Sequence, residues 1–141
     1  MSVDRFFLDT NIFVYSFDPD APAKSTTAEK LITLGRTSGL GVISYQVAQE
    51  FVNVATRRFA ETMTPEGLER YLLRVLFPLL KIHSSAELFL QALHLQSVSR
   101  LSWYDSLIVA AAVQDGCKTL FSEDLQQGQR FGDLVVRNPF L

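Results

Sequence analysis

Four acidic side chains stand where the sequence indicates that one structural element ends or the next begins. They are Asp9, Glu50, Asp105 and Asp124. Carboxylates gathered in one place repel each other and cannot all ionise without compensation. Hard divalent cations such as Mg²⁺ and Mn²⁺ take oxygen ligands of this kind. If the fold brings the four together, they predict an acidic cleft that binds a metal ion.

Two of these positions follow predicted parallel strands. Asp9 directly follows an apolar strand over residues 3–8, and Glu123 and Asp124 follow a strand over residues 118–121. Open parallel sheets place their functional groups at the carboxyl ends of the strands, so both acid groups are expected at one edge of the sheet. The alternative is that these acids only cap turns. The geometry also leaves open whether Glu123 or Asp124 faces the cleft.

Glu50 falls inside a helix predicted from the N-cap Ser44 to residue 59. Helical spacing puts four polar residues on one face, namely Gln46, Glu50, Asn53 and Arg57. The opposite, core-facing stripe consists of Val47, Phe51, Val54 and Ala55. This polar face is either a solvated surface or one wall of the cleft.

Asp105 lies three residues after Ser102, at the start of another predicted helix. Ser-x-x-Asp is also an ordinary capping pattern, which is the structural alternative for this acid. Residues 107–113 are apolar all round, which indicates a buried helix. A carboxylate at the entrance of such a helix is expected at a cleft edge, where it needs a cation or good hydrogen-bond donors.

The elements that must position these acids alternate along the chain. The predicted strands cover residues 3–8, 40–43, 79–82, 118–121 and 133–137. The predicted helices cover residues 23–36, 45–59, 65–77, 84–98 and 102–116, with a short helix or apolar turn at 12–15. This alternation indicates an α/β fold, in which helices cover both faces of a central parallel sheet of four or five short strands. No linker divides the chain, so we expect a single domain over residues 1–141.

Composition and the absence of familiar motifs argue against disulfide-bonded, membrane-spanning, nucleotide-binding and serine-hydrolase proteins. The net charge of −2 carries no basic signature of nucleic-acid binding, although a bound cation could offset this locally. One cysteine, Cys117, rules out an intrachain disulfide, and a cytoplasmic location is expected. No apolar run approaches the roughly 20 residues that span a membrane. Walker, dinucleotide-binding and serine-hydrolase motifs are absent, and His83 and His94 have no metal-ligand spacing.

Four short stretches resemble, in order, the four motifs of PIN domains. They are residues 8–12 (LDTNI), 44–51 (SYQVAQEF), 103–112 (WYDSLIVAAA) and 119–125 (TLFSEDL). The sequence is most similar to VapC-type toxins of type II toxin–antitoxin systems. The resemblance implies a PIN-like three-layer α/β/α sandwich and a Mg²⁺- or Mn²⁺-dependent endoribonuclease. It also implies a homodimer and a VapB-like antitoxin partner.

Position by position, the resemblance implies that Asp9, Glu50, Asp105 and Asp124 form the catalytic quartet. Asp9, Asp105 and Asp124 would be metal ligands. Asn11 and Ser122 would support the site. Asp124 is chosen over Glu123 because the family's acid lies two residues beyond the hydroxyl. The main alternative is a non-catalytic PIN-like module that binds RNA or protein. Receiver-type and haloacid-dehalogenase-type domains fit less well, since the first needs a middle-strand Asp and the second a second acid at position 11.

Overall fold

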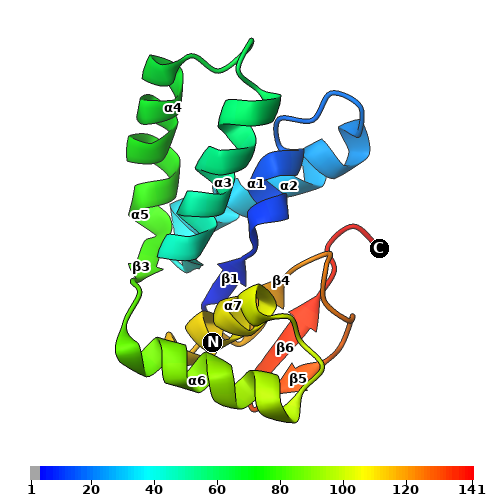
Figure 1. Ribbon diagram of the computed structural model, residues 1–141. Coiled ribbons are helices and arrows are strands. Elements are labelled where there is room, and N and C mark those ends of the chain that lie inside the picture. The colour runs from blue at the N-terminus through cyan, green and yellow to red at the C-terminus, as the bar shows by residue number, and fades with distance from the viewer. Residues whose placement is uncertain (1–3) are drawn as a thin grey trace.

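The computed structural model describes residues 4–141, so Val3, where the first strand was predicted to begin, lies outside the described residues. A six-stranded sheet has the order β3-β2-β1-β4-β6-β5 (Figure 1). The strands are β1 (Phe6–Leu8), β2 (Gly41–Ser44), β3 (Leu80–Ile82), β4 (Thr119–Phe121), β5 (Arg130–Phe131) and β6 (Leu134–Arg137). All neighbouring strands pair in parallel except β5 and β6, which are antiparallel.

Helices connect β1, β2, β3 and β4 in turn, whereas a loop and β5 connect β4 to β6. The helices are α1 (Thr10–Tyr15), α2 (Pro22–Ser38), α3 (Tyr45–Arg58), α4 (Pro65–Tyr71), the π-helix η1 (Leu72–Leu76), α5 (Phe77–Leu79), α6 (Ala86–Val98) and α7 (Trp103–Gln114). Figure 1 shows α6 and α7 side by side, in front of the lower part of the sheet. Among residues 4–141, no helix is both long and apolar enough to cross a membrane.

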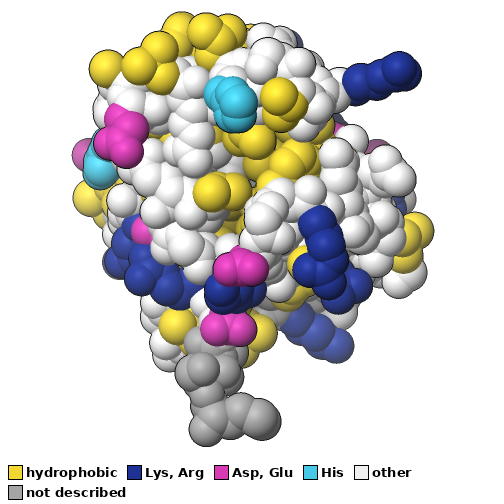
Figure 2. All heavy atoms as spheres, turned by 90° about the horizontal axis from the view of Figure 1, so that it is seen from below, with side chains coloured by type: hydrophobic (Ala, Val, Ile, Leu, Met, Phe, Trp, Pro, Cys, Tyr) yellow, Lys and Arg dark blue, Asp and Glu magenta, His cyan; other side chains and the backbone are white. Residues whose placement is uncertain are grey.

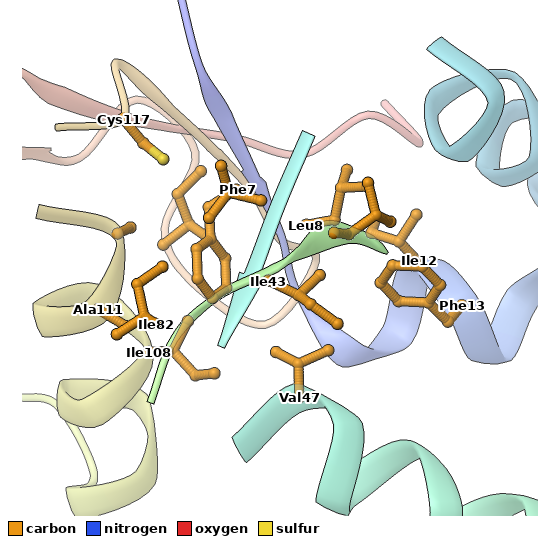
Figure 3. Packing of buried hydrophobic residues seen from close by; sticks show 14 of the residues in the cluster. Phe7, Leu8, Ile12, Phe13, Ile43, Val47, Ile82, Ile108, Ala111 and Cys117 are labelled. Carbon is orange, nitrogen blue, oxygen red and sulfur yellow. The ribbon is translucent and has the colours of Figure 1, made fainter. Parts of the chain in front are cut away.

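Successive side chains of β1 point to opposite faces of the sheet, and helices cover both faces. The Phe6 ring packs close to Gly35 of α2. Figure 3 shows the Phe7 ring on the same side as Ala111 and Ile108 of α7. Because β1 lies between two layers, all three of its residues are buried. The predicted three-layer α/β/α architecture is confirmed.

One predicted helix differs in shape. The sequence predicted a helix from residue 65 that Pro78 interrupts. Instead α4 continues through η1 into α5, and Pro78 lies in the first turn of that short last helix. The N–H of Phe77 reaches back five residues to the carbonyl of Leu72. Proline is tolerated in a first helical turn because its missing N–H is not needed there, so a π-turn precedes it without a break in the chain's direction.

The sheet is also larger than predicted. The two-residue strand β5 pairs with β6 through a tight turn at Gly132, whose φ is +62°. A strand this short has no hydrophobic alternation for a sequence pattern to detect. The four parallel pairings that join the other strands carry the site.

Candidate active site

Asp9 and Ser122 lie next to each other because β1 and β4 are adjacent parallel strands. Leu8 is in register with Phe121, so the residue after each strand emerges at the same sheet edge. The Asp9 N–H donates to the Phe121 carbonyl at 3.1 Å. The Ser122 hydroxyl donates to Asp9 Oδ2 at 2.7 Å, and the Thr10 N–H donates to Oδ1 at 2.7 Å. Asp9 thus caps α1 and also lies at the cleft.

The Asp9 carboxyl is held in a position that disfavours its charge. Its side chain is buried, with a relative exposure of 5%. Burial raises the pKa of Asp9 to about 6, although the hydrogen bonds from Ser122 and Thr10 act in the opposite direction. The nearby carboxylates of Asp124 and Glu50 are smaller contributors to this rise in the pKa of Asp9. A buried carboxyl with this balance is stabilised in its charged form by a nearby cation.

Glu50 reaches the same place from α3. The Thr10 hydroxyl donates to Glu50 Oε1 at 2.7 Å, which ties the second acid to the residue that follows the first. Thr10 is buried and lines the cleft, yet the sequence prediction left it out of the site. Its position directly after the strand-end acid, in a short apolar helix, is the signal that could have found it.

The four predicted acids line one cavity of about 280 Å³. Other residues that line it are Thr10, Asn11, Ile108 and the polar face of α3, namely Gln46, Asn53 and Arg57. Val54, predicted as a core residue of α3, is only partly buried and also lines the cleft. The polar face of α3 is therefore a wall of the cleft and not only a solvated surface.

Asp105 takes part in the N-cap of α7 through its backbone and lines the cleft through its side chain. The Asp105 N–H donates to the Ser102 hydroxyl at 3.1 Å, so its backbone completes the N-cap of α7. Its carboxylate lines the cleft and raises the pKa of Asp124. The backbone thus satisfies the helix end while the side chain remains available to a ligand.

Asp124 enters from the loop after β4. Asn11 Nδ2 donates to Asp124 Oδ2 at 2.8 Å, and the Asp124 N–H donates to the Ser122 hydroxyl at 3.2 Å. Its pKa is raised, first by partial burial and then by the carboxylates of Asp105 and Glu123. Of the two predicted supporting residues, Asn11 therefore contacts Asp124, and Ser122 contacts both Asp9 and Asp124.

Glu123 is engaged elsewhere. The Tyr15 hydroxyl donates to Glu123 Oε1 at 2.6 Å, and Lys24 Nζ lies 2.7 Å from Oε2. Lys24 and Tyr15 lower the pKa of Glu123, so it is held as a carboxylate. Glu123 does not line the cleft, whereas Asp124 does. Of the two adjacent acids, the structure places Asp124 with the other three.

The donor chemistry of the cleft suits a hard divalent cation, since it offers carboxylate, amide and hydroxyl oxygens. The acids are not yet gathered at ligand distances. Among residues 4–141, no three His, Cys, Asp or Glu side chains lie close enough together to hold a metal ion. Mutual repulsion keeps uncompensated carboxylates apart. A metal ion would therefore have to draw these side chains inward by rotamer changes.

The fold and the strand-end acids define an α/β domain with an acidic cleft at the carboxyl edge of its sheet. The family model of the PIN domain matches residues 6–130. The chain belongs to the PIN domain family. No curated protein matches the sequence.

Solved structures share this fold. The VapC20 toxin of Mycobacterium tuberculosis, described as cleaving the sarcin–ricin loop, is 20% identical with a TM-score of 0.63, over 84% of this chain and 91% of that chain. A toxin–antitoxin complex from Klebsiella pneumoniae is 16% identical with a TM-score of 0.65, over 94% and 96%. VapBC2 of Rickettsia felis, bound to a promoter DNA fragment, is 21% identical with a TM-score of 0.62, over 94% and 97%.

Proposed function

We propose that this protein is a Mg²⁺-dependent endoribonuclease and the toxin of a VapBC-type toxin–antitoxin module. The observation that carries the proposal is the convergence of four acids, from four separate segments, on one cleft. The similarity to a toxin described as cleaving the sarcin–ricin loop supports RNA as the substrate class. We extend the proposal to residues 1–141 acting as one domain.

Asp9, Asp105 and Asp124 are the proposed ligands of Mg²⁺ or Mn²⁺. All three line the cleft. Both oxygens of Asp9 accept hydrogen bonds, whereas within residues 4–141 no hydrogen bond is found to Asp124 Oδ1 or to either carboxylate oxygen of Asp105. When bound, the ion would supply positive charge that polarises the scissile phosphate and lowers the pKa of water.

The chain's own residues would orient the carboxylates of the site and accept a proton. Ser122 and the Thr10 N–H donate hydrogen bonds to Asp9, and Asn11 donates one to Asp124, so both carboxylates are held at the cleft before a ligand arrives. Glu50 accepts the Thr10 hydroxyl through Oε1 only. Its other oxygen accepts no hydrogen bond found within residues 4–141. We assign Glu50 the role of accepting a proton from the attacking water through this oxygen.

Two protein partners belong to the proposal. Two of the similar structures are toxin–antitoxin assemblies, which supports a VapB-like antitoxin for this chain.

A second copy of the chain is the other proposed partner, through the outer face of α6. Figure 2 views the molecule from the α6 side, and hydrophobic side chains gather over this helix. Those more than half exposed are Phe89, Leu90, Leu93 and Val98. Glu87 is the only charged residue of α6, so two copies would meet without like-charge repulsion.

One observation favours the second candidate, a PIN-like module that binds RNA or protein without cleaving it. The described residues contain no preassembled group of three metal-ligating side chains. Both candidates predict the same fold, so only a measurement of chemistry separates them.

The test is cleavage of structured RNAs by the purified chain, with Mg²⁺ or with EDTA. We expect cuts within unpaired loops that require the metal. Asp9→Asn and Asp105→Asn should abolish them while circular dichroism shows a folded protein. Full cleavage by either variant would contradict the site assignment. Metal-independent binding without any cleavage would favour the non-catalytic module.

A further inference from the structure

We propose that a small pocket next to the acidic cleft binds one unpaired base of the RNA. The pocket has a volume of about 110 Å³. It lies between the start of α3, the end of β3 and the start of α7, and its lining includes Ser44, Tyr45, Gln46, His83, Tyr104 and Leu107. The inference rests on the proposed function, because it takes RNA as the substrate.

Ser44 supplies the first observation. It occupies the N-cap position of α3, as predicted, but its side chain makes no capping hydrogen bond. Its hydroxyl is buried and has no partner within residues 4–141, with a relative exposure of 3% for the residue. A buried hydroxyl without a partner is costly and uncommon. Because the hydroxyl itself is buried, a ligand in this pocket would satisfy it through a turn of the Ser44 side chain toward the pocket.

Aromatic rings supply the second observation. Tyr45 and Tyr104 line the pocket, and their relative exposures are 45% and 64%. The Tyr45 and His83 rings lie with centroids 6.1 Å apart at an interplanar angle of 42°. Single-stranded RNA is commonly held by stacking of splayed bases on exposed aromatic side chains.

The pocket's chemistry selects a base over a phosphate. Within the described part of the chain, no lysine or arginine lines it. Ile82, Leu88 and Leu107 give it apolar walls, while Ser44, Gln46 and Gln49 offer hydrogen-bonding groups. A flat ring with polar atoms along one edge matches such a surface. A phosphate would find no charged partner there.

The pocket's position connects it to the acids. Gln46 lines both the pocket and the cleft, and its Nε2 donates to the Tyr104 carbonyl at 3.2 Å. Asp105 is the next residue in the chain and lines the cleft. A base in this pocket would therefore leave its adjoining phosphate beside the acidic site. The pocket would thus select the nucleotide next to the cut.

The test is binding of fluorescent, short, unpaired RNAs to the full chain in EDTA, measured by anisotropy. The RNAs differ in base identity at one position, and an abasic oligomer of equal length is the phosphate probe. We expect one base to be preferred and the abasic oligomer to bind more weakly. Tyr45→Ala should weaken binding about tenfold, the size of a lost stacking contact. Ser44→Ala should reduce the preference among bases.

The matched control is Phe77→Ala. The exposed fraction of Phe77, 46%, nearly equals that of Tyr45, 45%. Both residues line a second groove, but only Tyr45 also lines the pocket. Equal weakening by Tyr45→Ala and Phe77→Ala would overturn the inference, as would an abasic oligomer that binds as tightly as the others. Cleavage with an unaltered base preference in Ser44→Ala and Tyr45→Ala would reject the pocket alone. The expected binding pattern without any metal-dependent cleavage would support the pocket and reject the proposed catalysis.

Discussion

Burial, two hydrogen-bond donors and two nearby carboxylates all affect the pKa of Asp9, and their effects are opposed. The donors Ser122 and Thr10 favour the charged form, whereas burial and the other acids favour the neutral form. Burial is the largest influence, so the pKa rises to about 6. In the metal-free protein this carboxyl is therefore partly protonated near pH 6, and a cation would displace its proton.

The raised pKa of Asp9 predicts how stability depends on pH without metal. The folded-state pKa of about 6 lies above the unfolded value, so the native state binds the proton more tightly. Its stabilising contribution is full below pH about 4 and is lost as pH rises through 6. The change is about 2 to 3 kcal/mol in the free energy of unfolding. Urea titrations in EDTA should show this decrease for the wild type and a smaller one for Asp9→Asn. Identical pH profiles would contradict it.

Among residues 4–141, Arg57 is the one arginine that lines the acidic cleft. Its neighbour Arg58 lies over the Phe59 ring, 5.6 Å from the centroid, and does not line the cleft. We expect Arg57 to contact an RNA phosphate. Arg57→Gln should raise KM about tenfold with little change in kcat, as expected for a lost charge-assisted hydrogen bond. Arg58→Gln is the matched control, and equal effects of the two substitutions would refute a specific contact.

At the scale of elements, α1, α2 and the loop after β4 are joined by one group of side chains. Lys24 of α2 pairs with Glu123 at 2.7 Å and lies 4.6 Å from the Tyr15 ring centroid. The Phe140 ring packs edge-on against Tyr15 at 5.0 Å. This group holds Glu123 on one side of the loop, while Asn11 holds Asp124 on the other.

Lys24→Met should therefore loosen Asp124 without unfolding the protein. We expect Mn²⁺ affinity to fall about tenfold, as for other residues that orient metal ligands. The unfolding midpoint should change little, because partly exposed ion pairs contribute little to stability. Lys118→Met is the control, since Lys118 pairs with Asp133 at 3.4 Å away from the cleft. Calorimetric titration measures the affinity. Equal affinities of the two variants would remove Lys24 from this role.

Periodicity predicted the elements well where one face of an element is buried. Strand-end acids, the polar face of α3 and the apolar α7 could all be located from spacing alone. Contacts between distant segments could not be predicted this way. The Tyr15–Lys24–Glu123 group depends on how α1, α2 and the β4 loop meet, so spacing alone could not separate Glu123 from Asp124, and only the family resemblance favoured Asp124. Likewise, the missing cap bond of Ser44 and the π-turn before Pro78 arise from tertiary packing.

For the whole molecule, the net charge of −2 and the acidic cleft argue against RNA binding through a broad basic surface. Recognition would depend on a few side chains at the cleft and a small pocket, and cleavage on a bound cation. This arrangement suits a short exposed loop better than a long duplex.

The α6 face predicts self-association. Leu93→Glu should convert a dimer into a monomer, because a charge would be buried at an apolar contact. Sedimentation velocity measures the change in mass. Leu34→Glu on α2 is the matched control, since the two leucines are 51% and 52% exposed. A monomeric wild type, or an unchanged mass for Leu93→Glu, would contradict the proposed interface.

The central claim is that Asp9, Asp105 and Asp124, which come from three separate segments, form one metal site. Calorimetric titration of Mn²⁺ into the RNA-free protein tests it most directly. The account predicts saturable binding by the wild type and by Asp133→Asn, whose exposed side chain lies outside the cleft. It predicts loss of that binding in Asp9→Asn, Asp105→Asn and Asp124→Asn. Absence of binding by the wild type, or wild-type affinity in any of these three variants, would contradict it.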